Sequence, residues 1–303
     1  MMRSFKDILE AAKTTKPGRL VTTFREADLG LIGRATAAGF IVPCLVGDGK
    51  AMEKLIGRSP LASLEHEVVD EKDPGRMLHR AISLIHEHRA SILMQGNDDQ
   101  NTFLNAALGG GTGLRKGKLA SYVSIFEMPE PGKLILVTDT FLNNFPGITE
   151  KQRILENALS LSALLGIESP KVAVLAAIEQ VNPNIPSTLD AAILSKMCAR
   201  GQFGKALVEG PLDIDCSLSH VAANRKGIKS PVTGNVDIYL VPEVDTGCLL
   251  AEFLVCIGRI PTAGMVMGTT CPVILDVPFV SDECRLVEIA LASLALSKGE
   301  GHG

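Results

Sequence analysis

A glycine-rich loop with three cations, GGGTGLRKGK at residues 109–118, could bind an anion. Its glycines allow the backbone to turn several N–H groups toward one point, and we assign that role to Gly110, Gly111 and Gly113. Arg115 adds a guanidinium, which binds phosphate through paired hydrogen bonds. The alternative is a flexible surface loop with solvated charges, because the pattern of a Walker nucleotide-binding loop is absent.

Two further strings carry polar side chains next to turns. GPLDID places Asp213 and Asp215 directly after an apolar run, where open α/β sheets bind ligands. KSPVTG offers the Lys229 ammonium and the Ser230 hydroxyl to an oxyanion. The alternatives are that the two aspartates cap the following turn or helix, and that Pro and Gly shape a strand-entry turn with an exposed lysine.

Thiol and metal chemistry find little support. The seven cysteines are dispersed without a C-x-x-C pair, which favours small buried hydrophobes in a reducing compartment. Cys284 follows Asp282 and Glu283, and these neighbours would raise rather than lower the pKa of its thiol. The six histidines show no metal-ligand spacing alongside acids, so we predict no metal.

Predicted strands and helices alternate along the chain, and these elements must position the residues named above. Apolar runs predict strands at 20–24, 41–48, 90–96, 172–178, 205–208, 237–241, 264–267 and 273–276. Helical spacing predicts helices from Ser4, over 27–38, from Thr149 to Gly166, from Ser187 to about 200, and over 247–257 and 282–296. Thr149 with Gln152 and Ser187 with Asp190 form predicted capping boxes. This alternation predicts an α/β fold with mainly parallel sheets.

Composition restricts the partners. Hydrophobic residues make up 46% of the 303 residues and aromatic residues 4%, so Val, Ile, Leu and Ala must build the cores of two lobes. A net charge of −4 argues against nucleic acid and anionic membranes as partners. The sequence shows neither a signal peptide nor an apolar run that could span a bilayer. We therefore expect a soluble, cytoplasmic protein.

Several strings between 134 and 255 resemble the phosphate acetyl/butyryltransferase family, and phosphate butyryltransferases most closely. They are LILVTDTFLN, PKVAVLAAIEQVNP, TLDAAILSKMCARGQ, GPLDID and KSPVTGNVDIYLVPEVDTG. The resemblance implies transfer of a short-chain acyl group between CoA and inorganic phosphate, with CoA or acyl-CoA as substrate and no bound cofactor. It also implies a homo-oligomer, a dimer or larger.

The family resemblance further implies two α/β domains with a cleft between them, as in isocitrate and isopropylmalate dehydrogenases. One domain would comprise 1–147 plus 268–303 and the other 148–267. Arg115 matches an arginine that the family uses for phosphate or substrate, and Asp215 matches a common family aspartate. Lys229 and Ser230 match the family's K-S-P-V-A-G turn.

The chain departs from the family near its end. Val277 and Pro278 stand where the family has a Ser-Arg pair, and Gln95 replaces a lysine. Ser281 and Asp282 follow closely and are the catalytic substitutes that we predict, together with Arg115. The alternative for Ser281 is a helix cap, with the acids next to it favouring the positive end of the helix. An alternative function is a catalytically impaired or repurposed homologue that binds CoA or acyl-CoA without turnover.

Overall fold

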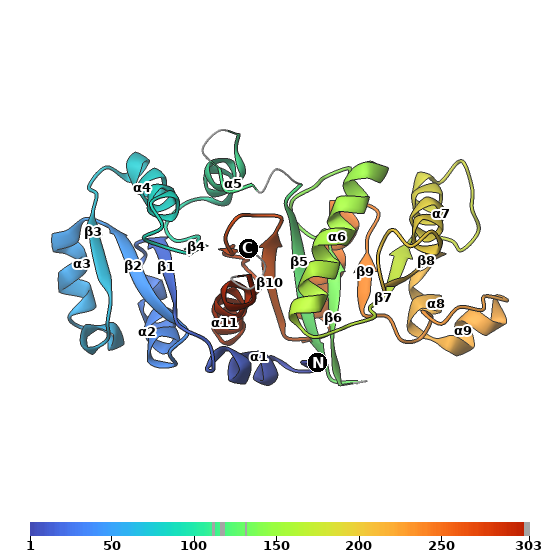
Figure 1. The fold of residues 1–303 in the computed structure, drawn as a ribbon, viewed down its shortest axis with the longest axis horizontal. Coiled ribbons are helices and arrows are strands. Elements are labelled where there is room, and N and C mark those ends of the chain that lie inside the picture. The colour runs from blue at the N-terminus through green and yellow to red at the C-terminus, as the bar shows by residue number, and fades with distance from the viewer. Residues whose placement is uncertain (111–112, 116–118, 131, 300–303) are drawn as a thin grey trace. The chain divides into compact units, whose positions relative to one another are not determined.

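The structure is a computed structural model that describes residues 1–110, 113–115, 119–130 and 132–299 (Figure 1). The chain forms two compact units, each built from two segments. One unit combines Met1–Ser4 with Leu119–Thr262, and the other combines Phe5–Lys118 with Ala263–Gly303. The domain boundaries at 147 and 268 stay a prediction. By contacts the chain changes units at Leu119 and at Ala263, because strand β6 (Lys133–Thr138) pairs with strand β9 (Ile238–Leu240).

The unit that contains residue 5 has its strands in the order β3-β2-β1-β4-β11-β10. All neighbouring pairs from β3 to β11 are parallel, and β10 pairs with β11 in the antiparallel sense. The strands are β1 (Gly18–Thr23), β2 (Ile41–Gly47), β3 (Glu67–Asp70), β4 (Ile92–Met94), β10 (Thr262–Met267) and β11 (Val273–Ile274). Its helices are α1 (Phe5–Ala12), η1 (Glu26–Asp28), α2 (Leu29–Ala37), α3 (Gly49–Ile56), η2 (Pro60–Ser63), α4 (Pro74–His86), α5 (Gln100–Leu108) and α11 (Asp282–Gly299).

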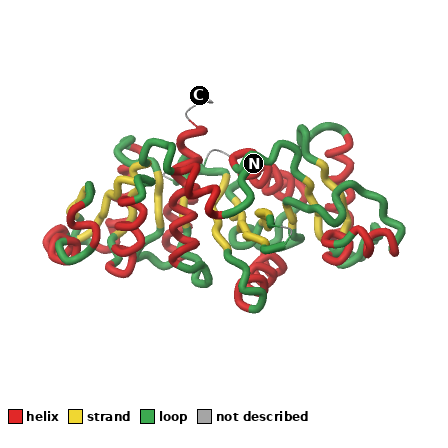
Figure 2. The backbone as a smooth tube through the Cα atoms, turned by 90° about the horizontal axis from the view of Figure 1, so that it is seen from below, coloured by secondary structure: helices red, strands yellow, loops and turns green. Residues whose placement is uncertain are grey.

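The unit formed mainly by Leu119–Thr262 has the strand order β5-β6-β9-β7-β8. β5 and β6 form an antiparallel pair, and the remaining neighbours are parallel. The strands are β5 (Ser121–Met128), β6 (Lys133–Thr138), β7 (Lys171–Leu175), β8 (Leu207–Leu212) and β9 (Ile238–Leu240). The helices are α6 (Ile148–Leu164), α7 (Pro186–Ala199), α8 (Ile214–Leu218), α9 (His220–Arg225) and α10 (Val244–Cys256). Helices lie on both sides of these strands (Figure 2).

The predicted fold class, α/β with mainly parallel pairing, is confirmed. Strand cores are continuous aliphatic runs; Ile92, Leu93 and Met94 in β4 are all buried, as are Val172 to Leu175 in β7. Such runs indicate strands covered on both faces. Among the described residues, no helix is long and apolar enough to cross a membrane.

Both predicted capping boxes were wrong. Helix α6 begins two residues earlier than the box required, with Gly147 as its N-cap and the Glu150 carboxylate accepting from the Gly147 N–H at 2.7 Å. Helix α7 begins at Pro186 after Ile185, which gives no side-chain cap. Asp190 instead accepts from the Lys151 Nζ at 2.6 Å, so tertiary pairing replaces local capping. Asp190 also lines the cavity that is described below.

Candidate functional site

Strands β1, β4 and β11 end at one edge of the sheet in the unit that contains residue 5, since all three are parallel. Parallel strands bind ligands beyond their carboxyl ends. The backbones after β1 and β4 approach closely: a Cβ at Gly96 would lie 1.9 Å from the carbonyl oxygen of Thr23. Only glycine fits there, and the polar side chains that follow each strand are therefore brought together.

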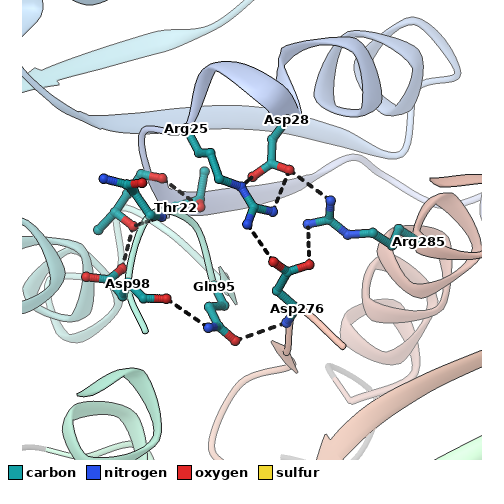
Figure 3. A network of polar contacts seen from close by, with 9 residues as sticks. Thr22, Arg25, Asp28, Gln95, Asp98, Asp276 and Arg285 are labelled. Atoms are coloured by element: carbon teal, nitrogen blue, oxygen red, sulfur yellow. Dashed lines mark hydrogen bonds and ion pairs between the residues drawn. The ribbon is translucent and has the colours of Figure 1, made fainter. Parts of the chain in front are cut away.

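The Arg25 guanidinium, which follows β1, is held by two carboxylates (Figure 3). Its Nε and Nη2 donate to the two oxygens of Asp28 at 2.8 Å each, and its Nη1 donates to Asp276 Oδ2 at 2.5 Å. The hydrogen bond with Asp28, aided by Asp276, raises the pKa of Arg25 against the opposing effect of burial. Arg25 is a permanently charged group whose side chain is 25% exposed.

Arg285 reaches the same carboxylates from helix α11. Its Nη1 donates to Asp28 Oδ1 at 2.8 Å, and its Nη2 lies 3.6 Å from Asp276 Oδ1. The side chain is only 9% exposed, and its Nε has no hydrogen-bond partner among the described residues. Two guanidinium groups and two carboxylates therefore balance in charge, which is what a buried cluster of this kind requires.

Gln95 connects β4 to the end of β11. Its Nε2 donates to the carbonyl oxygen of Asp98 at 2.9 Å, and its Oε1 accepts from the Asp276 N–H at 3.0 Å. A lysine at this position could donate but not accept. The replacement of the family lysine that the sequence revealed thus coincides with a side chain that orients Asp276, the partner of Arg25.

The region around the missing Ser-Arg pair presents little side-chain chemistry. Val277 is buried, with 2% exposure, and Pro278 is exposed. Ser281 Oγ accepts from the Cys284 N–H at 3.3 Å, so Ser281 caps α11 as the alternative held. Asp282 is the exposed first residue of that helix. The catalytic roles predicted for Ser281 and Asp282 stay predictions.

The glycine-rich loop is described in part. Gly111, one of the predicted amide donors, lies outside the described residues, while Gly110 is exposed with open space around its Cα. A Cβ at Gly113 would lie 2.1 Å from the carbonyl oxygen of Gly109, so the chain passes too close for another residue. Arg115 is exposed and forms an isolated antiparallel bridge with Thr269. The bridge to Thr269 therefore holds the backbone of Arg115, and the side chain is exposed.

The KSPVTG turn is closed by its own hydrogen bonds. Ser230 Oγ accepts from the Val232 N–H at 3.2 Å, and Thr233 Oγ1 donates to the Ser230 carbonyl at 3.0 Å. Lys229 is exposed. No described residue accepts from the Ser230 hydroxyl, and the predicted substrate-binding roles of Lys229 and Ser230 stay predictions.

Asp213 and Asp215 are joined by one cation. The Lys226 ammonium contacts the carboxylates of Asp213, Glu179 and Asp215, the last at 3.0 Å. Hydrogen bonding with Asp213 and then Lys226 lowers the pKa of Glu179 to about 2. These carboxylates and the Cys216 thiol lie within 4.8 Å of one another, so a metal ion there would have to displace Lys226. Asp213 also caps α8 by accepting from the Cys216 N–H at 3.1 Å, as the alternative held.

A second candidate site is a cavity of about 850 Å³ in the unit formed mainly by Leu119–Thr262. It lies where β7, β8 and β9 end, and its polar lining includes Lys151, Asp190, Asp213, Glu243 and Thr246. Lys151 is 5% exposed although it carries a charge. Asp190 belongs to this lining, which the capping interpretation had missed.

Sequence reasoning missed Arg25, Asp276 and Arg285 as a group. One signal was available: Arg285 and Glu288 lie three residues apart within the apolar pattern of the last helix, and both are buried in the structure. Charges on a helix face that is otherwise apolar require partners. Nothing in the local sequence named those partners, because they come from the ends of β1 and β11.

Comparison with known proteins identifies the family of this chain. The sequence profile of the family described as phosphate acetyl/butaryl transferase matches residues 47–291. A phosphate butyryltransferase of Clostridium acetobutylicum is 34% identical over 296 residues, covering 97% of this chain and 98% of the relative. A probable phosphate butyryltransferase of Bacillus subtilis is 36% identical and covers 83% of each chain. The chain therefore belongs to the phosphate acetyl/butaryl transferase family.

Solved structures agree with this assignment. A branched-chain phosphotransacylase from Enterococcus faecalis V583 superposes with a TM-score of 0.75 at 27% identity, covering 91% of this chain and 98% of that one. A phosphotransacetylase from Streptococcus pyogenes reaches a TM-score of 0.81 at 16% identity, covering 97% and 100%, and supports the fold alone. The predicted family is confirmed, and by family the chain is an enzyme.

Proposed function

We propose that this protein transfers a short-chain acyl group between CoA and inorganic phosphate. The observation that carries the proposal is full-length similarity: the family profile spans residues 47–291, and a phosphate butyryltransferase aligns over 97% of the chain. CoA or acyl-CoA would be a substrate, no separate cofactor would be required, and the reaction would take place in the cytoplasm.

In this proposal Arg115 binds the phosphate. Its side chain is exposed while its backbone is fixed by the bridge to Thr269, so the guanidinium is available for a paired hydrogen bond. The amides of Gly110, Gly111 and Gly113 would add donors to the same anion. Lys229 would attract the other anionic substrate, acyl-CoA, as an exposed ammonium.

The attack of phosphate on a thioester develops negative charge on the carbonyl oxygen, which hydrogen-bond donors must stabilise. Ser230 and Ser281 each accept a backbone N–H and keep a hydroxyl hydrogen to donate. The departing thiolate needs a proton, and in the reverse direction the thiol needs a base, the role that we propose for Asp282. Asp215 is paired with Lys226 and would position substrate through that pair.

A homo-oligomer, a dimer or larger, is part of the proposal. Leu249, Phe253 and Ile257 recur at four-residue spacing along and just after α10, and are 68%, 61% and 69% exposed. Residues at this spacing share one helix face, and large exposed apolar faces mark interaction sites. Phe253→Glu would then lower the oligomer mass in light scattering, and an unchanged mass would exclude this face as the interface.

The test of the activity is release of free CoA thiol from acetyl-CoA, butyryl-CoA and branched acyl-CoA, with and without phosphate. We expect release only when phosphate is present. Absence of phosphate-dependent release over the whole panel would overturn the proposal, and CoA binding without turnover would then identify a non-catalytic homologue.

A further inference from the structure

The cavity in the unit formed mainly by Leu119–Thr262 lies at a junction of strand ends and helix starts. Leu175, the last residue of β7, lines it, as do Asp213 and Pro242, which follow β8 and β9. Helices α6, α7 and α10 begin beside it, since Lys151, Ser187 and Thr246 from their first turns also line it. A volume of about 850 Å³ is that of a small-molecule site.

The walls of this cavity are largely apolar. Nine of the fifteen lining residues are aliphatic, aromatic or proline, among them Phe145, Ile214 and Leu250. A lining of this kind binds an elongated, uncharged chain by removing carbon surface from water.

The polar groups at the cavity include both donors and acceptors. Helices α7 and α10 begin after Ile185 and Glu243 without a side-chain cap. Pro186 has no N–H, and the N–H groups of Thr188 and Val244 donate to the carbonyl oxygens of Ile185 and Asn144. Among the described lining residues, this leaves the N–H groups of Ser187 and Thr246 for a ligand. The Lys151 ammonium has one described partner, Asp190, and can donate further hydrogen bonds. Asp190 and Glu243 supply acceptors. Amides, which both donate and accept, match such a lining.

The side-chain charges of the cavity disfavour phosphate groups. Its described lining contains three carboxylates, those of Asp190, Asp213 and Glu243, and a single cation, Lys151, which already pairs with Asp190. Lys226 contacts Asp213, but it also contacts two other carboxylates. Like charges in a partly desolvated pocket repel strongly. This lining favours an uncharged part of CoA over its diphosphate and 3′-phosphate.

We infer that this cavity binds the pantetheine arm of the CoA thioester, which is uncharged, contains two amides and joins the thioester. Lys151 is a positioning residue that donates to a carbonyl oxygen of the arm. The inference rests on the proposed function, because it takes the ligand to be a CoA thioester.

The experiment fills the cavity and uses two halves of CoA as probes. Ala177 is exposed and lines the cavity, so Ala177→Trp adds bulk without opening the core. The matched control is Ala199→Trp, at an exposed alanine that ends α7 and is not among the described lining residues. Pantetheine and adenosine 3′,5′-bisphosphate are each titrated as inhibitors of phosphate-dependent cleavage of butyryl-CoA, which is followed by the loss of thioester absorbance because pantetheine is itself a thiol.

We expect Ala177→Trp to raise the Ki of pantetheine about tenfold or more, because the filled cavity can no longer bury a few methylene groups of the ligand. The Ki of the bisphosphate should stay unchanged. Ala199→Trp would change neither. Lys151→Met would raise the Ki of pantetheine about tenfold to a hundredfold, and Lys196→Met, an exposed lysine of α7, would not. The unchanged response to the bisphosphate shows that the filled variant is folded.

Two results overturn the inference while the proposed function stands. One is an unchanged Ki of pantetheine in Ala177→Trp, and the other is a rise for the bisphosphate alone, which would place the adenosine end in the cavity. If wild-type protein shows no turnover, the proposed function fails, and calorimetry with the same probes decides the inference. Pantetheine binding that Ala177→Trp abolishes supports it, and no binding to wild type overturns it.

Discussion

Arg25 and Asp276, which are 251 residues apart in the sequence, are joined by a hydrogen bond of 2.5 Å. Arg25 follows β1 and Asp276 follows β11, so the contact ties the ends of two strands that β4 separates in the sheet. Asp28 and Arg285 complete the cluster. The end of β11, where the resemblance predicts the loss of a Ser-Arg pair, is thus held by the ion pairs of Asp276.

Asp276→Asn should destabilise the protein. It removes a charge that faces two guanidinium groups, and because Asp276 is 29% exposed and Arg25 is 25% exposed, we expect a loss of about 1–2 kcal/mol in the free energy of unfolding. The measurement is the urea midpoint. The control is Glu283→Gln, which breaks an exposed 3.5 Å pair with Arg34 and should cost less than about 0.5 kcal/mol. Equal losses in the two variants would contradict a special role for Asp276.

Gln95→Lys should lower stability rather than restore family chemistry. Lysine cannot accept from the Asp276 N–H, and Gln95 is only 4% exposed, so a buried donor loses its partner and a charge enters. We expect a lower thermal midpoint and no gain in thiol release. Gln202→Lys, at an exposed position, serves as the control. Faster turnover in the Gln95→Lys variant would show that the family lysine can act in this structure.

Acid stability should depend on Lys226. The pKa of Glu179 falls from 4.5 to about 2 on folding, through hydrogen bonds with Asp213 and Lys226. A group whose folded pKa is lowered contributes stability above its unfolded pKa and loses it as the pH falls. Stability should therefore drop between pH 4.5 and about pH 2.

Lys226→Met should reduce this loss of stability at low pH. Lys205→Met, which replaces an exposed lysine, should leave it unchanged. Thermal midpoints recorded through the same pH window provide the measurement. If the thermal midpoint of Lys226→Met falls with pH as steeply as that of wild type, Glu179 titrates independently of the ammonium.

The local sequence pattern predicted helices and strands well, but it did not predict contacts between residues that are far apart in the sequence. The last helix, predicted over 282–296, is α11 at Asp282–Gly299, and the strand predicted over 41–48 is β2 at Ile41–Gly47. Period and turn residues are local properties, and they suffice for such elements. Lys151 and Asp190 pair across 39 residues because α6 and α7 pack together, which no window of sequence contains.

Candidate site residues likewise divide into those with a local sequence signal and those whose contacts depend on strand order. The helix-cap alternative for Ser281 rests on a local signal, serine before two acids, and the cap is present, while the predicted catalytic role of Ser281 stays a prediction. The cluster of Arg25 with Asp28, Asp276 and Arg285 depends on strand order. The resemblance to the family gave residues that match its motifs, and it could not give partners that meet only through the order of the strands.

Arg115→Ala should weaken phosphate use without unfolding the protein. Loss of a charge-assisted contact of about 1.5–3 kcal/mol raises the KM for phosphate about tenfold to a hundredfold. Since Arg115 is exposed, the thermal midpoint should stay that of wild type. Arg58→Ala, at another exposed arginine, is the control. Unaltered phosphate kinetics in Arg115→Ala would remove the glycine-rich loop from the site.

Rebuilding the family pair as Val277→Ser with Pro278→Arg should not raise activity. Val277 is 2% exposed, so the new serine hydroxyl would lie in the core instead of facing substrate, and removing the valine methyl groups should cost about 1–2 kcal/mol of stability. Pro278 is exposed, so the new arginine would extend into solvent. Thiol release and urea unfolding of wild type, both single variants and the double variant provide the measurements. A folded double variant that is faster than wild type would mean that the end of β11 can turn both side chains toward substrate, and that the missing pair limits the reaction.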